Sequence, residues 1–153
     1  MNWCRYRFRS SWRLDAQPAA VYAALARVER YPDWWEQVRY ARPIDGDSVE
    51  LMIRSVLPVE IRMTAHSSRR DPAAGVLEAR LSGDLTGFSR WTVTPHAGGT
   101  RVVFEEVVDA SAHPVLRRFA FARPVFQANH AAMMWRGRAG LRAHLRDLTT
   151  PLV

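Results

Sequence analysis

The sequence contains no lysine and only one cysteine, Cys4, among its 153 residues. Without lysine, the chain has no side-chain amine for Schiff-base catalysis and no lysine for a phosphate-binding loop. A single cysteine cannot form an internal disulfide, so we expect a reducing, cytoplasmic location. No apolar run approaches the roughly 20 residues of a membrane-spanning helix. The N-terminus alternates in polarity, unlike the continuous apolar stretch of a signal peptide.

Metal and nucleotide motifs are also missing. The five histidines, at positions 66, 96, 113, 130 and 144, show no paired metal-binding spacing, and there is no second cysteine. The segment Gly83–Gly87 has no following lysine, and Gly87–Trp91 lacks the second glycine of a nucleophile elbow. We therefore expect neither a metal nor a cofactor.

All 22 basic residues are arginine, and the net charge is +7. Codon bias in a GC-rich genome is one explanation, and a positive surface that attracts phosphate, nucleic acid or anionic lipid is another. Arg5, Arg7 and Arg9 alternate with Tyr6 and Phe8 and so occupy the opposite face of a strand. Proteins that bind single-stranded nucleic acid instead interleave exposed aromatics with their cations, so we expect no nucleic-acid partner.

The periodicity predicts an α+β fold. Residues Cys4 to Leu14 alternate as in a half-buried strand, and Asp15 with Pro18 marks the start of a short helix that ends near Arg30. Residues 31–38 form a second short helix, and residues 38–108 read as strands and turns without a helix between them. This pattern indicates an antiparallel meander, with about seven strands in all.

The C-terminal segment changes to helical spacing. From Pro114 to about Asp147, one stripe holds the inward set Phe119, Phe126, His130, Met133, Gly137, Leu141 and Leu145, and Pro124 predicts a break near residues 122–123. One helix can cover only part of a seven-stranded sheet. The sheet must therefore curve around the helix and leave a cavity for an apolar small molecule. We expect one ligand-binding domain over residues 1–153.

Several phrases, taken in order, resemble the START / polyketide cyclase–dehydrase (SRPBCC) superfamily. These are residues 15–22 (DAQPAAVY), 30–35 (RYPDWW), 83–87 (GDLTG) with Trp91, 99–102 (GTRV), and Asn129-His130 followed by Met133 or Met134 and Gly137. The resemblance spans almost the whole chain. It implies the helix-grip fold, with an internal pocket for lipids, polyketides, quinones or hormones. Some relatives cyclise or dehydrate polyketides and others only bind or carry a ligand, so the resemblance does not fix the chemistry.

His130 and Glu106 are the candidate catalytic residues. His130 lies on the inward stripe, where it could exchange a proton near neutral pH, or it could be a core histidine bonded to a carbonyl. Glu105 and Glu106 point to opposite faces of one strand, and the alternation of residues 100–108 favours Glu106 inside. Its partner could be Arg54, Arg80 or His130. The pair could be an acid/base couple or a structural ion pair.

Aromatic and methionine side chains suit an irregular apolar ligand. The candidate pocket residues are Trp35, Met52, Met63, Trp91, Phe104, Phe126, Asn129 and Met133. Asn129 could hold a substrate carbonyl or bond to a loop, and ordinary core packing is the alternative for the others. The first functional hypothesis is a polyketide cyclase/dehydrase-like enzyme. The second is a non-catalytic lipid or quinone carrier or sensor, and the third is a partner-binding module that uses the basic surface.

Overall fold

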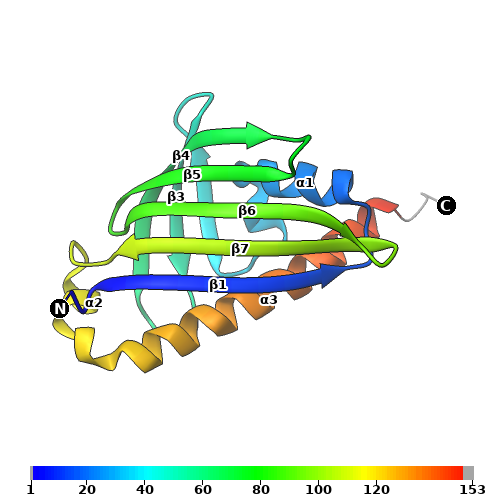
Figure 1. The fold of residues 1–153 in the computed structure, drawn as a ribbon. Helices are drawn as coiled ribbons and strands as arrows, with labels where there is room; N and C mark the ends of the chain where they lie inside the picture. The colour runs from blue at the N-terminus through cyan, green and yellow to red at the C-terminus, as the bar shows by residue number, and fades with distance from the viewer. Residues whose placement is uncertain (1, 150–153) are drawn as a thin grey trace.

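A computed structural model describes residues 2–149, and the strands in this part form one antiparallel sheet beside a long helix (Figure 1). The sheet order is β1-β7-β6-β5-β4-β3-β2. The strands are β1 (Arg5–Leu14), β2 (Val38–Pro43), β3 (Ser48–Arg54), β4 (Glu60–Asp71), β5 (Val76–Gly83), β6 (Thr86–His96) and β7 (Gly99–Asp109). The helical elements are α1 (Pro18–Ala26), η1 (Val28–Asp33), α2 (Pro114–Arg118), η2 (Ala120–Ala122) and α3 (Arg123–Thr149).

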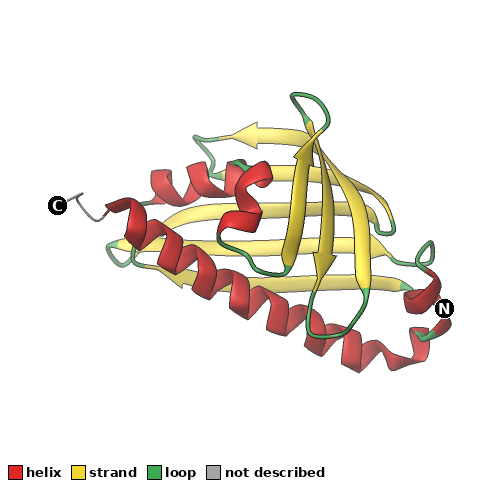
Figure 2. Ribbon diagram, turned by 180° about the vertical axis from the view of Figure 1, so that it is seen from behind, coloured by secondary structure: helices red, strands yellow, loops and turns green. Residues whose placement is uncertain are grey.

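The sheet is strongly curved. Figure 2 shows β2, β3 and β4 standing across the direction of β1, β7 and β6, while α3 runs along the open side of the sheet. The curvature follows from burial, because the inward face of seven strands must be covered by one long helix and two short helical segments. The predicted curved sheet around a C-terminal helix is confirmed.

Strand parity decides which side chains face the helix. In β7, Thr100, Val102, Phe104, Glu106 and Val108 are all buried. Glu106 is therefore the inward carboxyl, as the alternation predicted, and Glu105 points to the outer face. The same rule places Tyr6, Trp12 and Leu14 of β1 inside.

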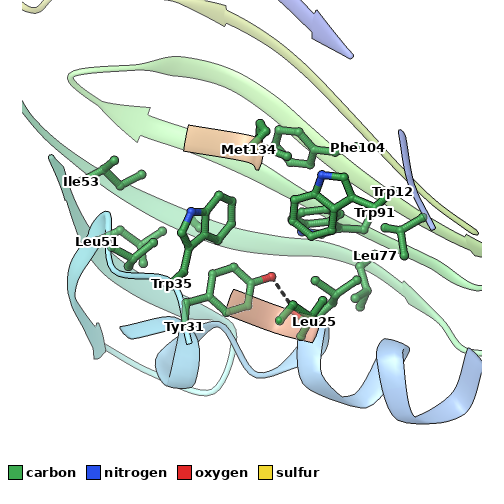
Figure 3. Packing of buried hydrophobic residues seen from close by; sticks show 14 of the residues in the cluster. Trp12, Leu25, Tyr31, Trp35, Leu51, Ile53, Leu77, Trp91, Phe104 and Met134 are labelled. Atoms are coloured by element: carbon green, nitrogen blue, oxygen red, sulfur yellow. Dashed lines mark hydrogen bonds between the residues drawn. The ribbon is translucent and has the colours of Figure 1, made fainter. Parts of the chain in front are cut away.

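The double tryptophan holds α3 close to the rest of the fold. Both Trp34 and Trp35 are buried, and Trp35 Nε1 donates a hydrogen bond of 3.1 Å to the Met133 carbonyl. A methyl group added at Gly137 would lie 2.5 Å from Trp35 Cε2, and one added at Gly140 would meet the Trp34 carbonyl at 1.8 Å. The two glycines therefore permit this close approach. Figure 3 shows Trp35 beside Trp91 in the core.

The helix boundaries differ in detail from the sequence pattern. The residue before α1 is Gln17, not Asp15, and the second short helix is the 3₁₀ segment η1, which starts three residues earlier than predicted. The break near Pro124 is confirmed, because α2 and η2 end before α3 begins at Arg123. Phe119 was expected on the inward stripe, and this expectation is wrong. It lies in the turn between α2 and η2, out of phase with α3, and is 43% exposed.

The helices in residues 2–149 include none that is long and apolar enough to span a bilayer.

Candidate functional site

Two adjacent cavities lie between the sheet and the helices. The first, named here the tryptophan cavity, gives the centres of water-sized molecules about 120 Å³ of space. The second, the histidine cavity, gives about 80 Å³. One water needs only roughly 10–15 Å³ on this measure, so each cavity can hold a group larger than a single water.

The tryptophan cavity has an apolar wall and a polar rim. Its wall includes Leu25, Tyr31, Trp35, Leu51, Met63, Leu77, Leu81, Trp91, Phe104 and Met133. Several of these side chains face one another in Figure 3, where the Tyr31 hydroxyl donates to the Leu25 carbonyl at 2.7 Å. Exposed Glu29, Asp47 and Arg70 lie at the rim. An apolar wall with few polar groups is typical of a small-molecule site.

The histidine cavity lies beside the N-terminal half of α3. Its lining includes Tyr6, Phe8, Ser55, Leu57, Val59, Leu85, Leu116, Phe126, Asn129 and His130. Asn129 Oδ1 accepts a hydrogen bond of 3.1 Å from the Leu57 backbone amide, so this side chain ties the loop at residues 55–59 to the helix. Ile53, Glu106 and Met133 line both cavities and therefore form the boundary between them.

Glu106 places a carboxyl group at this boundary. Its register neighbours are Phe8 on β1 and Ser89 on β6, and the residue is only 8% exposed. No arginine supplies a counter-charge, since Arg54 and Arg80, considered as partners, are both exposed. Burial raises the pKa of Glu106 to about 7, because the ionised carboxylate loses its hydration there.

His130 is the titratable group that faces Glu106. Its Nε2 lies 4.0 Å from Glu106 Oε1, which is longer than a hydrogen bond. Phe8 stacks on the imidazole with ring centroids 3.7 Å apart. Burial lowers the pKa of His130 to about 4. Between about pH 4 and 7, both groups are therefore mainly uncharged: an imidazole that can accept a proton faces a carboxylic acid that can donate one.

Neither sequence-based alternative for this pair describes the geometry. Within residues 2–149, neither ring nitrogen of His130 takes part in a hydrogen bond, so it is not a core histidine bonded to a carbonyl. A 4.0 Å separation between two uncharged groups is also not a structural ion pair. The gap leaves room for a group of a bound molecule to contact both side chains.

Two further polar groups were not predicted from the sequence. The Tyr6 hydroxyl and Ser55 Oγ are buried beside the histidine cavity without a hydrogen-bond partner. Burial also raises the pKa of Tyr6. Leaving a buried hydroxyl unsatisfied costs about 1–3 kcal/mol, so such atoms indicate a place where water or a ligand completes the bonding. The inward parity of Tyr6 in β1 was visible in the sequence, whereas Ser55 follows the end of β3 and carried no such signal.

The predicted lining residues have mixed outcomes. Trp35, Met63, Trp91, Phe104 and Met133 line the tryptophan cavity, while Phe126 and Asn129 line the histidine cavity. Their contact with a ligand stays a prediction. Met52 lines neither cavity, and its selection was wrong. Strand parity explains the correction: Leu51 and Ile53 face inward, so Met52 points to the other face of β3 with Glu50 and Arg54.

The part of the chain that the structure describes contains no group of three or more His, Cys, Asp or Glu side chains placed to hold a metal ion. The site's chemistry must therefore be argued from Glu106, His130, Tyr6 and Ser55.

The curved sheet, the C-terminal helix and the cavities between them define the helix-grip class of ligand-binding folds. Residues 5–146 match the family model described as "Polyketide cyclase / dehydrase and lipid transport", and the chain belongs to this family, within the START/SRPBCC superfamily. No curated protein sequence matches the chain.

Solved structures agree with this assignment. The Zhui aromatase/cyclase from Streptomyces sp. R1128 is similar with a TM-score of 0.78 and 15% identity, over 95% of this chain and 96% of that one. The protein TTHA0849 from Thermus thermophilus gives 0.75 and 16%, over 95% and 100%. A START superfamily protein from Mycobacterium smegmatis gives 0.72 and 14%, over 94% and 99%. At such identities the likeness establishes the fold alone.

Proposed function

We propose that the protein binds an apolar small molecule that carries oxygen atoms, and that it acts on this molecule as a cyclase/dehydrase-like enzyme. One observation carries the proposal: Glu106 is a buried carboxyl without a cation, 4.0 Å from His130, at the boundary of two cavities. Displaced pKa values inside a cavity are common where proton transfer occurs. The matching family and the similarity to the Streptomyces aromatase/cyclase support the same reaction class.

The pKa directions assign the two roles. His130 is uncharged above about pH 4 and can take a proton from the carbon next to a ketone. Glu106 is protonated below about pH 7 and can give its proton to a departing β-hydroxyl group. The C–H and C–O bonds break, a C=C bond forms and water leaves. His130 then returns its proton to Glu106, while the Tyr6 and Ser55 hydroxyls stabilise the enolate oxygen by hydrogen bonding.

A second function, carriage of an apolar ligand without chemistry, is favoured by the wall of the tryptophan cavity. Apart from Glu106, the polar residues that line it are Glu29, Asp47, Ser67, Arg70, Glu78 and Ser89. The exposed members of this set lie at the rim, so most of the enclosed surface can bind an apolar body without taking part in a reaction. The buried, free Cys4 fits a reducing compartment, and a cytoplasmic location is part of both proposals.

Ligand binding is tested with the neutral fluorescent probe N-phenyl-1-naphthylamine and by native mass spectrometry of the purified protein. We expect the probe to bind and to be displaced by ligands that co-purify. Ala65→Leu places a larger side chain in the tryptophan cavity and should weaken probe binding. Ala23→Leu makes the same change at an exposed position of α1 and should leave binding unchanged. Equal binding to both variants would contradict a ligand site in this cavity.

Catalysis is tested with the β-hydroxyketone 4-hydroxy-4-phenylbutan-2-one, whose dehydration gives an absorbing enone. We expect turnover that is lost in Glu106→Gln and His130→Gln, whereas both variants still bind the probe. The rate should be highest between about pH 4 and 7, and should fall above this range as Glu106 ionises. Binding without turnover in the unmodified protein would support the carrier instead.

A further inference from the structure

The charge of this protein is concentrated in one segment. Residues 110–146 contain seven arginines and no aspartate or glutamate. The remainder of the chain contains fifteen arginines and fifteen acidic residues, so the whole net charge of +7 belongs to this segment. It comprises α2, η2 and nearly all of α3. Codon bias acts on the entire chain and does not explain this distribution.

The arginines of this segment are not neutralised by the fold. Within residues 2–149, Arg117, Arg118, Arg123, Arg136, Arg138 and Arg142 form no ion pair with a carboxylate. Arg117, Arg136 and Arg142 are also exposed. The α2–α3 side of the molecule therefore presents a positive field to solvent.

The outward side of the same helices is apolar. Residues 124–135 contain no charged side chain apart from a neutral histidine, although a surface helix normally carries its charges on the outside. Phe121 is 76% exposed, Trp135 is 67% exposed and Val125 is 51% exposed. On a helical wheel, residues 121, 125, 128, 132 and 135 fall on the side opposite Met133, Gly137 and Leu141.

Neighbouring elements extend this surface. Phe119 packs against Phe121 with ring centroids 6.0 Å apart. Trp3 is also exposed, and its backbone carbonyl accepts a hydrogen bond from Arg123 at the start of α3. We name the exposed set Trp3, Phe119, Phe121, Val125 and Trp135 the aromatic face. Figure 1 shows the N-terminus beside α2, next to the start of α3.

We propose that the aromatic face and its arginines dock the protein on the surface of an anionic lipid membrane. A convex helix that combines exposed tryptophan and phenylalanine with arginine fits the boundary between headgroups and acyl chains. Anionic headgroups supply the counter-charge that the fold does not. A second copy bound through the same face would bring the two sets of arginines together, which opposes such a dimer. Docking would also bring the histidine cavity, whose wall includes Phe126 and His130, close to the lipid.

The experiment is co-sedimentation with vesicles. We expect binding to vesicles of equimolar phosphatidylcholine and phosphatidylglycerol, little binding to phosphatidylcholine alone, and release at high salt. The double variant Phe121→Ser/Trp135→Ser should bind roughly tenfold or more weakly, because it removes two interfacial anchors. Ile44→Ser/Phe88→Ser is the matched control, since it also removes two exposed apolar side chains, on β6 and in the β2–β3 hairpin.

A second pair of variants tests the charge. Arg117→Gln/Arg136→Gln/Arg142→Gln should lose binding to the anionic vesicles, whereas Arg27→Gln/Arg39→Gln/Arg54→Gln has the same net charge and should keep most of it. Far-ultraviolet circular dichroism checks that each variant is folded. The proposal is overturned if the protein does not bind anionic vesicles, or if both members of a pair bind equally. It is also overturned if the aromatic face mediates a dimer that does not bind lipid.

Discussion

Glu106 Oε1 and His130 Nε2 lie 4.0 Å apart at the boundary of two cavities, and burial alone keeps both groups uncharged near neutral pH. The pKa of the carboxyl is raised and that of the imidazole is lowered by loss of hydration, without an opposing charge. Each group therefore has its own signature in the dependence of stability on pH.

The first prediction concerns this dependence. The folded state holds a proton on Glu106 that the unfolded chain releases between about pH 4.5 and 7, so this contribution to stability is lost as the pH rises. His130 does the reverse: the unfolded chain binds a proton between about pH 4 and 6.5 that the folded state excludes, so stability rises with pH there.

Relative to the unmodified protein, Glu106→Gln should therefore gain stability as the pH rises through about 4.5 to 7. His130→Gln should lose stability, relative to the same reference, between about pH 4 and 6.5. Each slope is limited to about 1.4 kcal/mol per pH unit. Urea denaturation at a series of pH values measures both, and slopes of the same sign would rule out this assignment.

The second prediction concerns the unpartnered Tyr6 hydroxyl. Tyr6→Phe removes a buried group that has no hydrogen bond, so stability should stay the same or increase. Tyr31→Phe is the matched change, because that hydroxyl is bonded to the Leu25 carbonyl at 2.7 Å. It should cost about 1–2 kcal/mol. Thermal denaturation compares the two, and an equal loss in both variants would show that Tyr6 has a partner in solution.

The third prediction concerns Phe8, whose ring stacks on the imidazole at 3.7 Å. Phe8→Ala should admit water to His130 and move its pKa from about 4 toward the ordinary value near 6.5. Phe88→Ala, on the exposed side of β6, should leave this pKa unchanged. Histidine proton resonances followed through a pH titration give the values. An unaltered midpoint in Phe8→Ala would mean that other groups exclude the water.

The fourth prediction concerns the contact between α3 and the double tryptophan. Gly137→Ala would place a methyl group 2.5 Å from buried Trp35 Cε2 and should destabilise the fold by about 1–3 kcal/mol, despite the better helix propensity of alanine. A methyl group at Gly46 would meet nothing within 4 Å, so Gly46→Ala should change stability by less than about 0.5 kcal/mol. Chemical denaturation tests this pair. A neutral effect of Gly137→Ala would show that Trp35 is free to move.

The regular elements were predictable because their periods are visible in the chain. Alternation over residues 100–108 placed Glu106 inside, and helical spacing placed His130 and Met133 on one inward stripe. The same arithmetic assigns Met52 to the outer face, and choosing it for its side-chain type instead of its parity gave the wrong result.

The remaining features depend on tertiary contacts. Nothing local in the sequence indicates that Ser55, just after β3, would be buried without a partner, or that Phe8 would stack on His130 from the far end of the chain. Phe119 left the predicted stripe because the chain turns between two helices, which resets the helical phase. The 4.0 Å gap at the site comes from the combined placement of β7 and α3, and no spacing encodes it.

The most direct test of the account is the pKa of Glu106 itself. A carbon-13 titration of labelled glutamate carboxyls, with the Glu106 signal assigned by its loss in Glu106→Gln, measures this value in the folded protein. The account predicts a midpoint near 7 for Glu106. A midpoint near the ordinary value of 4.5 would contradict it, because Glu106 would then be an ionised, hydrated carboxylate and not the buried acid of the cavity.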